Sequence, residues 1–260
     1  MMRSLWTAAT GMVAQQLNID VISNNLANVN TIGFKKSRAE FEDLMYQNMK
    51  IAGSPTEGGN LIPTGMQVGM GVKPTTVHKF FSQGDFQSTG NPLDMVVEGD
   101  GFFKVDVNGE DAYTRAGAFK LDKDGAIVTA NGYTLQPEFT VPLETVNIVI
   151  TEAGHLSALD KAGEELSSAD ITLHTFINPA GLKSMGRNLY LATDASGAAT
   201  EGTPGEDNVG TISQGFLEMS NVEIVDEMVS MIVGQRAYEI NSKAVQASDQ
   251  MLQMANNLKR

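Results

Sequence analysis

Apolar residues recur with a heptad spacing along the last stretch of the chain, from Val222 to Leu258. Steps of three and four residues, with one small change of phase before Val233, meet only apolar side chains. The set is Val225, Val229, Val233, Ala237, Ile240, Ala244, Ala247, Met251, Met254 and Leu258. Only Gly234 weakens the helical pattern. The spacing predicts one long helix of roughly 55 Å with a narrow apolar face.

The first stretch of the chain carries a second stripe with the same spacing, in which Gln15 is the only polar member. Its positions are Leu5, Ala8, Met12, Gln15, Ile19, Ile22, Leu26 and Val29. A narrow apolar stripe cannot be buried by its own helix, so we expect the two terminal helices to pair as a coiled coil. Two separate amphipathic helices on a globular core would show the same periodicity and are the alternative interpretation.

The first helix is expected to run from about Arg3 to Asn28 and to end in a cluster of asparagines before Gly33. Asparagine side chains compete for backbone hydrogen bonds and tolerate left-handed geometry, so this cluster predicts a helix end and a turn. A second, short helix is predicted over Ala39 to Met49.

A sharp change of composition follows, between Gly53 and Val72. Glycine permits positive φ and proline fixes φ, so the stretch predicts a long loop or an irregular hairpin. Its VGMGV string matches the dinucleotide fingerprint poorly, because no third glycine and no helix follow. The glycines and prolines are Gly53, Pro55, Gly58, Gly59, Pro63, Gly65, Gly69 and Gly71.

Strand and turn signals dominate from Val72 to about Val209. Asn-Gly and Asp-Gly pairs separate short runs rich in β-branched and aromatic residues, which predicts hairpins. The turns are Asn108-Gly109, Asp124-Gly125 and Asn131-Gly132; the runs are Met95 to Val97, Phe102 to Val107, Val146 to Ile150 and Ile171 to Ile177. A Ser-Gln-Gly triplet at residues 82–84 recurs at 213–215, which suggests that the outgoing and returning chains run side by side.

The expected fold is therefore α+β, with paired terminal helices and an inserted, mainly β central domain. We predict an N-terminal coiled-coil helix at 1–33, a connecting region with the Gly-rich loop at 34–95, and a β-rich outer domain at 96–211. A return connection at 212–221 leads to the C-terminal coiled-coil helix at 222–260.

Composition bears mainly on function. The formal net charge of −13 argues against a nucleic-acid surface, and the absence of cysteine excludes disulfides and thiolate sites. His78, His155 and His174 have no partner at metal-ligand spacing, and no catalytic motif emerges, so we expect no metal, no cofactor and no enzymatic activity. Nor do we expect a transmembrane segment, because no apolar run approaches about 18 residues. Polar residues break the apolar start of the chain, so a cleaved signal peptide is not expected.

Several segments carry a family resemblance that covers essentially the whole chain, least specifically at 138–207. They are NNLANVNTIGFKKSRAEFEDLMYQ, PTGMQVGMGVKPT, SQGDFQSTGNPLDMVVEGDGFFKV, YTRAGAFKLDKDG and SNVEIVDEMVSMIVGQRAYEINSKAVQASDQML. These segments closely resemble the flagellar axial proteins, the family of rod and hook subunits. The length and the Gly53 to Val72 stretch resemble most the subunits of the distal rod. A proximal rod or hook subunit of the same family is the alternative.

The resemblance implies a structural subunit that polymerises with itself into a rigid hollow tube and transmits motor torque to the hook. The stripe residues of both helices would be the assembly residues, and the Gly53 to Val72 loop would stiffen the rod. Implied partners are proximal rod and hook proteins, the ring proteins around the rod and the flagellar type III export apparatus. The implied location is the basal body, reached without a cleaved signal. A secreted binding module that dimerises through its helices is the alternative from a different class.

Overall fold

The computed structural model describes residues 2–53, 63–206 and 209–257. The chain forms two compact units. The first contains residues 1–26, 37–78 and 223–260, and the second contains 27–36 and 79–222. The chain therefore crosses between the units after residues 26, 36, 78 and 222.

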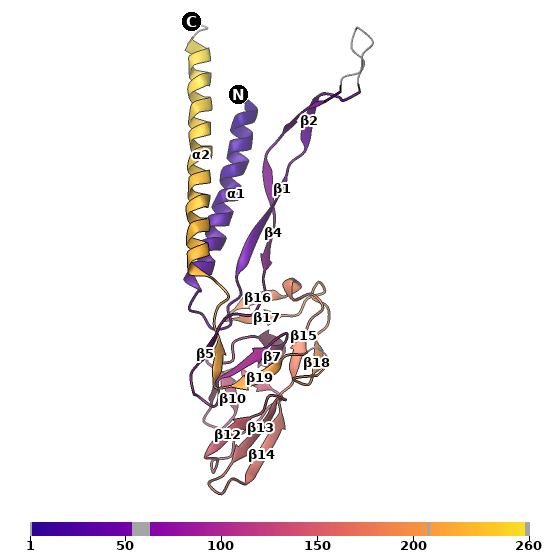
Figure 1. The fold of residues 1–260 in the computed structure, drawn as a ribbon, viewed down its shortest axis with the longest axis vertical. Helices are drawn as coiled ribbons and strands as arrows, with labels where there is room; N and C mark the ends of the chain where they lie inside the picture. Colours follow the sequence, from indigo (N-terminus) through magenta and orange to yellow (C-terminus); the bar gives the residue numbers. More distant parts are fainter. Residues whose placement is uncertain (1, 54–62, 207–208, 258–260) are drawn as a thin grey trace. The chain divides into compact units, whose positions relative to one another are not determined.

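The first unit is built on two long helices, α1 (Met2–Ala27) and α2 (Ile224–Asn257). They run antiparallel and side by side, with both chain ends at the same end of the pair (Figure 1). The pairing of the terminal helices, predicted from their stripes, is confirmed. Asp226 and Glu227 lie in the first turn of α2, where their negative charges interact favourably with the helix dipole and stabilise the helix. Past α1, Gly33 adopts a φ of +68° that a side chain would rarely tolerate.

Among its described residues the first unit also has four strands, drawn in purple beside the helices in Figure 1. They form two antiparallel ladders, β1 with β4 and β2 with β3. Their bounds are β1 (Ser37–Asp43), β2 (Tyr46–Lys50), β3 (Met66–Gly69) and β4 (Val72–Lys79). The Thr10 hydroxyl of α1 lies 3.4 Å from the Val72 amide and accepts its hydrogen bond.

The short helix predicted over Ala39 to Met49 is wrong, because β1 and β2 occupy these residues. The Asn25 side chain explains part of the difference. Its Oδ1 accepts from the Ser37 amide at 2.9 Å and its Nδ2 donates to the Ser37 carbonyl at 2.7 Å. This two-point contact holds Ser37 in an extended conformation, and pairing with β4 extends the strand from there.

The second unit is mainly β. Its largest sheet has the order β16-β17-β8-β7-β11-β10-β9, and β15 joins it by pairing with β7 and β18. The bounds are β7 (Phe102–Val107), β8 (Glu110–Thr114), β9 (Phe119–Leu121), β10 (Ile127–Thr129), β11 (Thr134–Gln136), β15 (Leu173–Thr175), β16 (Lys183–Gly186), β17 (Leu189–Leu191) and β18 (Thr200–Gly202), with a 3-10 turn at Pro179–Gly181.

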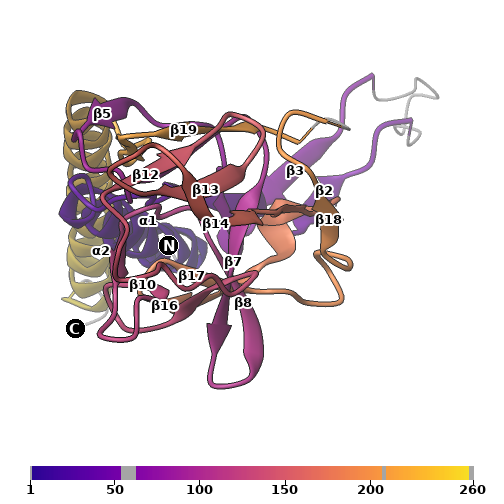
Figure 2. The same cartoon turned by 90° about the horizontal axis from the view of Figure 1, so that it is seen from below.

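A second antiparallel sheet of three strands has the order β12-β13-β14 (Figure 2). Its strands are β12 (Asn147–Ile150), β13 (His155–Leu159) and β14 (Glu165–Asp170). The predicted hairpin turns are confirmed. Asn108 and Gly109 join β7 to β8 with φ values of +56° and +90°, and the other two turns join β9 to β10 and β10 to β11.

The outgoing and returning chains pair at two places, as the repeated Ser-Gln-Gly triplet suggested. β5 (Phe86–Ser88) pairs with β20 (Phe216–Glu218), and β6 (Met95–Glu98) pairs with β19 (Thr211–Gln214). The two glutamines of the triplets act alike. The Gln83 side chain donates a hydrogen bond to the Val97 carbonyl and accepts one from the Gly99 amide. The Gln214 side chain likewise donates to the Ile148 carbonyl and accepts from the Ile150 amide.

Two apolar clusters fill the second unit. The larger packs the inward faces of the sheets around side chains such as Phe103, Leu156, Leu173 and Ile212, each 0% exposed. The smaller is aromatic, with Phe102, Tyr113, Phe176 and Tyr190 in edge-to-face contacts. These cores give the second unit its own hydrophobic interior, independent of the helices.

Candidate assembly surface

The contact between α1 and α2 combines polar, small and apolar residues. The Ser4 and Ser248 hydroxyls are 3.1 Å apart, and the Asn25 amide donates to Glu227 at 3.3 Å. At Gly234, which is buried, a Cβ atom would lie 3.2 Å from Ile19. The α2 backbone at Gly234 therefore lies close to the Ile19 side chain of α1.

The predicted apolar stripe of α2 lies on another face of the helix. Half-buried or buried residues that line the α1 side are each one position after a stripe residue: Gly234, Asn241, Val245, Ser248 and Leu252. At about 100° per residue, the centre of the stripe lies roughly 100° around the helix from that line. The stripe therefore points to one side of the helix contact and does not face α1.

The large side chains of the stripe are exposed over more than two fifths of their surface. Their exposed fractions run from 44% to 66% for Val225, Val229, Val233, Ile240, Met251 and Met254. Ala244 and Ala247 are exposed as well, whereas Ala237 is half-buried. Leu258 lies outside the described residues. Ile224, Met228 and Ile232 widen the exposed apolar surface at the start of the helix.

The predicted stripe of α1 is more deeply buried. Ile22 is buried, while Leu5, Met12, Ile19 and Leu26 are half-buried. Val29, also half-buried, follows the helix and belongs to the second unit. A different face of α1 leaves apolar side chains exposed, namely Met2, Trp6 and Val13.

A short ladder of charges lies beside the α2 stripe. Glu239 accepts from Lys243 at 2.7 Å and from Arg236 at 2.9 Å. The hydrogen bonds from Lys243 and Arg236 hold the pKa of the Glu239 carboxyl below its usual range. All three side chains are exposed, so they form a charged patch beside the apolar stripe.

The predicted stiffening loop falls partly within the described residues. Gly58 and Gly59 lie outside them. Gly53 and Pro63 flank the undescribed segment, and Gly65 follows it with a Cβ position only 2.9 Å from the Lys50 carbonyl. Gly69 ends β3, and Gly71 sits against the Thr10 side chain with a φ of +120°. In its described part the stretch therefore supplies strand β3, which pairs with β2, and the residues that lead into β4.

One group in the second unit was not anticipated from the sequence. Lys35, in the basic run after the first helix, is fully buried with Glu218. Its Nζ donates to Glu218 Oε1 at 2.6 Å and to the Ser82 carbonyl at 2.7 Å. Burial lowers the pKa of the Lys35 amine, and the Glu218 carboxylate opposes that shift. In the sequence, only the family resemblance of the flanking motifs could have indicated that Lys35 has a special role.

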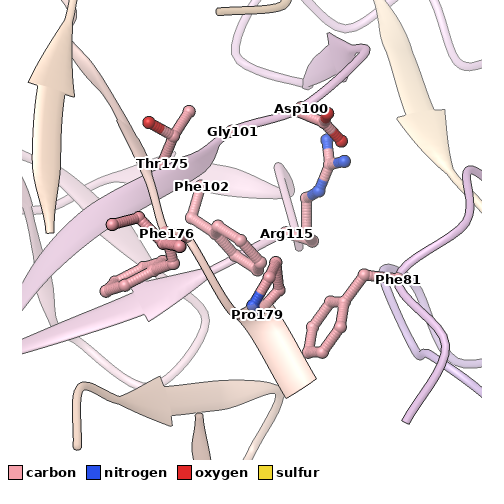
Figure 3. A pocket seen from close by; sticks show the side chains of 9 residues that line it. Phe81, Asp100, Gly101, Phe102, Arg115, Thr175, Phe176 and Pro179 are labelled. Atoms are coloured by element: carbon pink, nitrogen blue, oxygen red, sulfur yellow. The ribbon is translucent and has the colours of Figure 1, made fainter. Parts of the chain in front are cut away.

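A cleft of about 330 Å³ lies near this group, lined by Phe81, Phe102, Phe176, Pro179 and Arg115 among others (Figure 3). Arg115 is 3% exposed and donates to the Val97 and Gly99 carbonyls at 3.3 and 2.6 Å. Its guanidinium, directed toward Asp100 in Figure 3, is thus engaged in holding backbone segments. This arrangement is typical of a structural charge.

The three histidines lie apart in the fold. His155 pairs across strands with Asp170, at 2.7 Å from Nδ1, whereas His174 is buried in the aromatic cluster. Among the described residues, no three His, Asp or Glu side chains gather as a metal site. Within the same residues, neither helix combines the length and hydropathy that crossing a membrane requires.

Three family profiles match the chain. They are described as the flagellar hook protein FlgE/F/G D1 domain, the flagellar basal body rod FlgEFG protein C-terminal region, and the flagella basal body rod protein. They match residues 96–158, 213–258 and 5–35 respectively. The helices and part of the β unit thus define the class of flagellar hook and rod proteins.

Whole-length relatives narrow the class. The chain is 52% identical to the flagellar basal-body rod protein FlgG of Borreliella burgdorferi, with 100% of both chains covered. It is 47% identical to that of Caulobacter vibrioides, over 99% of this chain and 100% of the relative, and 41% identical to that of Bacillus subtilis, over 100% of both. The chain belongs to this family of flagellar basal-body rod proteins. It is a structural subunit that assembles into the rod of the basal body with other axial components.

Proposed function

We propose that this chain forms the distal part of the rod, where copies polymerise through their terminal helices into a stiff hollow tube that transmits torque to the hook. The observation that carries the proposal is the exposed apolar stripe of α2, which does not face α1. Exposed apolar patches of this extent mark interaction surfaces. In this proposal the stripe is the contact surface between copies.

The energetics favour burial of the stripe by other copies. Each Val, Ile or Met side chain removed from water contributes about 1.5–3 kcal/mol. Contacts that join different surfaces of successive copies generate a helical polymer when the rotation between copies does not close into a flat ring. Ala244 and Ala247 on this face allow a second copy to approach closely, and a bulky residue at Ala244 should stop assembly while the β unit stays folded.

The partners in this proposal are further copies of the chain, the proximal rod and hook proteins at the two ends, and the ring proteins around the tube. The chain reaches the basal body through the flagellar type III export apparatus, unfolded and without cleavage of a signal peptide. The absence of cysteine supports this route, because no disulfide can form before export. The Gly53 to Val72 stretch adds contacts between copies that stiffen the rod.

Electron microscopy of the full-length protein at rising concentration tests the proposal. We expect straight tubes from the full chain and monomers from a chain that lacks residues 1–30 and 222–260. A closed dimer would instead support a binding module, and a curved tube would support a hook subunit.

Point substitutions locate the contact surface. Val233→Asp places a charge on the stripe and should raise the concentration needed for assembly by at least about tenfold. Gln235→Asp, an exposed position two residues away and outside the stripe, is the matched control and should assemble normally. Equal assembly of the two variants would exclude the stripe as the contact surface.

A further inference from the structure

One heptad position of each terminal helix is occupied only by small or polar residues. On α1 these are Ser4, Gly11, Asn18 and Asn25, and on α2 they are Glu227, Gly234, Asn241 and Ser248. Within each helix they are spaced by seven residues, so they lie along one line of the helix surface. This polar line is distinct from the apolar stripe of α2.

The two polar lines face each other, member by member. Ser4 meets Ser248 and Asn25 meets Glu227 through side-chain hydrogen bonds. Between these ends, a Cβ at Gly11 would lie 2.8 Å from the Asn241 amide nitrogen, and a Cβ at Gly234 would lie 3.9 Å from that of Asn18. Each step of seven residues forward on α1 is therefore matched by seven residues back on α2.

The glycines make the fit reciprocal. Gly11 on α1 leaves a notch that receives Asn241 of α2, and Gly234 on α2 leaves a notch filled by Ile19 with Gln15 and Asn18 at its edge. Sliding one helix by a turn would move both side chains out of the notches. It would also separate both hydrogen-bonded pairs, leaving the Asn25 amide, which is 1% exposed, without its Glu227 acceptor.

Polar and notched layers in a helix pair favour one alignment more than they favour tight association. A purely apolar seam binds more strongly but is satisfied in several alignments, whereas a polar residue at a seam position specifies register at a cost in stability. The contrast on α2 is clear, because its strongly apolar stripe lies to one side of the contact and not against α1.

We propose that these eight residues form a register key, which aligns α1 and α2 in one antiparallel register and thereby fixes the direction in which the α2 stripe points. The orienting role rests on the proposed assembly surface; the alignment of the helices does not. A shift by one residue on α2 would turn its stripe by about 100°. Copies could then no longer present the same apolar surface to one another.

Cross-linking of the purified full-length chain, below the concentration at which it assembles, tests the register. The chain has no cysteine, so introduced pairs react only with each other. Ser4→Cys/Ser248→Cys replaces two hydroxyls that are 3.1 Å apart. Ser4→Cys/Leu252→Cys is the matched control, because Leu252 lies one turn further along the same side of α2.

Under mild oxidation we expect the first pair to cross-link within the chain at least about tenfold more than the control pair. Comparable yields from the two pairs, yields only between chains, or no cross-link from either pair would each overturn the proposal.

A second measurement separates the key from the mere existence of a helix pair. Each cysteine pair is introduced separately into a chain that also carries Asn18→Leu and Asn241→Leu. We expect the ratio of the two cross-links to fall toward about one, because apolar positions no longer distinguish the registers. An unchanged ratio would show that Asn18 and Asn241 do not set the register and would overturn the key of eight residues.

The two proposals fail in different ways. Loss of tubes in Val233→Asp with an intact Ser4→Cys/Ser248→Cys cross-link supports both. A correct cross-link in a chain whose Val233→Asp variant still forms tubes would exclude the stripe as the assembly surface and leave the register key standing.

Discussion

Lys35 and Glu218 form an ion pair that is wholly removed from solvent, with 2.6 Å between Nζ and Oε1 and 0% exposure of both side chains. The Glu218 Oε1 atom also accepts from the Gly84 amide at 3.0 Å, so one carboxylate oxygen joins three segments of the second unit. Those segments come from residues that are far apart in sequence.

Removal of one partner of this pair should destabilise the second unit strongly. Glu218→Gln leaves the Lys35 ammonium buried without its counter-charge, and we expect the free energy of unfolding to fall by about 3–5 kcal/mol. The double variant Lys35→Met/Glu218→Leu buries no charge and should recover much of the loss. Urea unfolding measures both, and single and double variants of equal stability would contradict the expectation.

Tyr190 should make the protein sensitive to alkali. Burial, with the Glu218 charge as a smaller cause, raises the pKa of the Tyr190 phenol to about 12. The fold favours the neutral phenol. Its contribution to the free energy of unfolding is therefore complete below about pH 10 and is lost as pH rises toward 12. The loss amounts to roughly 3 kcal/mol.

Tyr190→Phe keeps the ring and removes the ionisation. We expect unfolding curves of this variant to show a shallower decline of stability between about pH 10 and 12 than the parent protein. Parallel pH profiles for the two proteins would mean that Tyr190 ionises as readily in the fold as in the unfolded chain.

Gly234 should tolerate only a small increase in size. A Cβ there would lie 3.2 Å from Ile19 Cγ1, so Gly234→Ala requires a slight shift that the gain of about 1 kcal/mol in helix propensity offsets. Gly234→Leu cannot fit and should separate α2 from α1. Thermal loss of the helical circular dichroism signal checks this, with Ala244→Leu on the outward face as the control that leaves pairing unchanged.

His155 should titrate above the usual histidine range. The hydrogen bond to Asp170 raises the pKa of the imidazole, and the Glu165 carboxylate adds to the effect. The charged His155–Asp170 contact therefore contributes its full stabilisation below the ordinary histidine pKa. That stabilisation is lost as pH rises through the raised pKa of His155. NMR titration of the ring protons should show a lower pKa in Asp170→Asn than in the parent; identical values would contradict the assignment.

The sequence predicts much of the architecture because periodicity and turn chemistry are local. Both terminal helices and the Asn108-Gly109 hairpin follow from spacing and from residues that accept positive φ. The strand at Ser37 does not, since it depends on the Asn25 side chain and on pairing with β4. Tertiary contacts of this kind override local preference.

The candidate site was only partly predictable for a related reason. A heptad stripe identifies the apolar side of α2 but does not say what covers it. The side that faces α1 is offset by one residue, and its Gly234 looks like a weakness in the helix until its neighbour Ile19 is known. Lys35 was missed because a lysine next to Lys36 reads as surface charge, and only the fold brings Glu218 to it.

The contact between Ser4 and Ser248 joins residues 244 positions apart in the sequence. Such a contact forms only after nearly the whole chain is available, and closing so long a loop carries a large entropic cost before any contact is gained. Helix α1 can therefore complete its contacts only after α2 has been made. Until α2 has been made, the inward side of α1 has no partner, so the helix that is synthesised first is among the last segments to gain its native contacts.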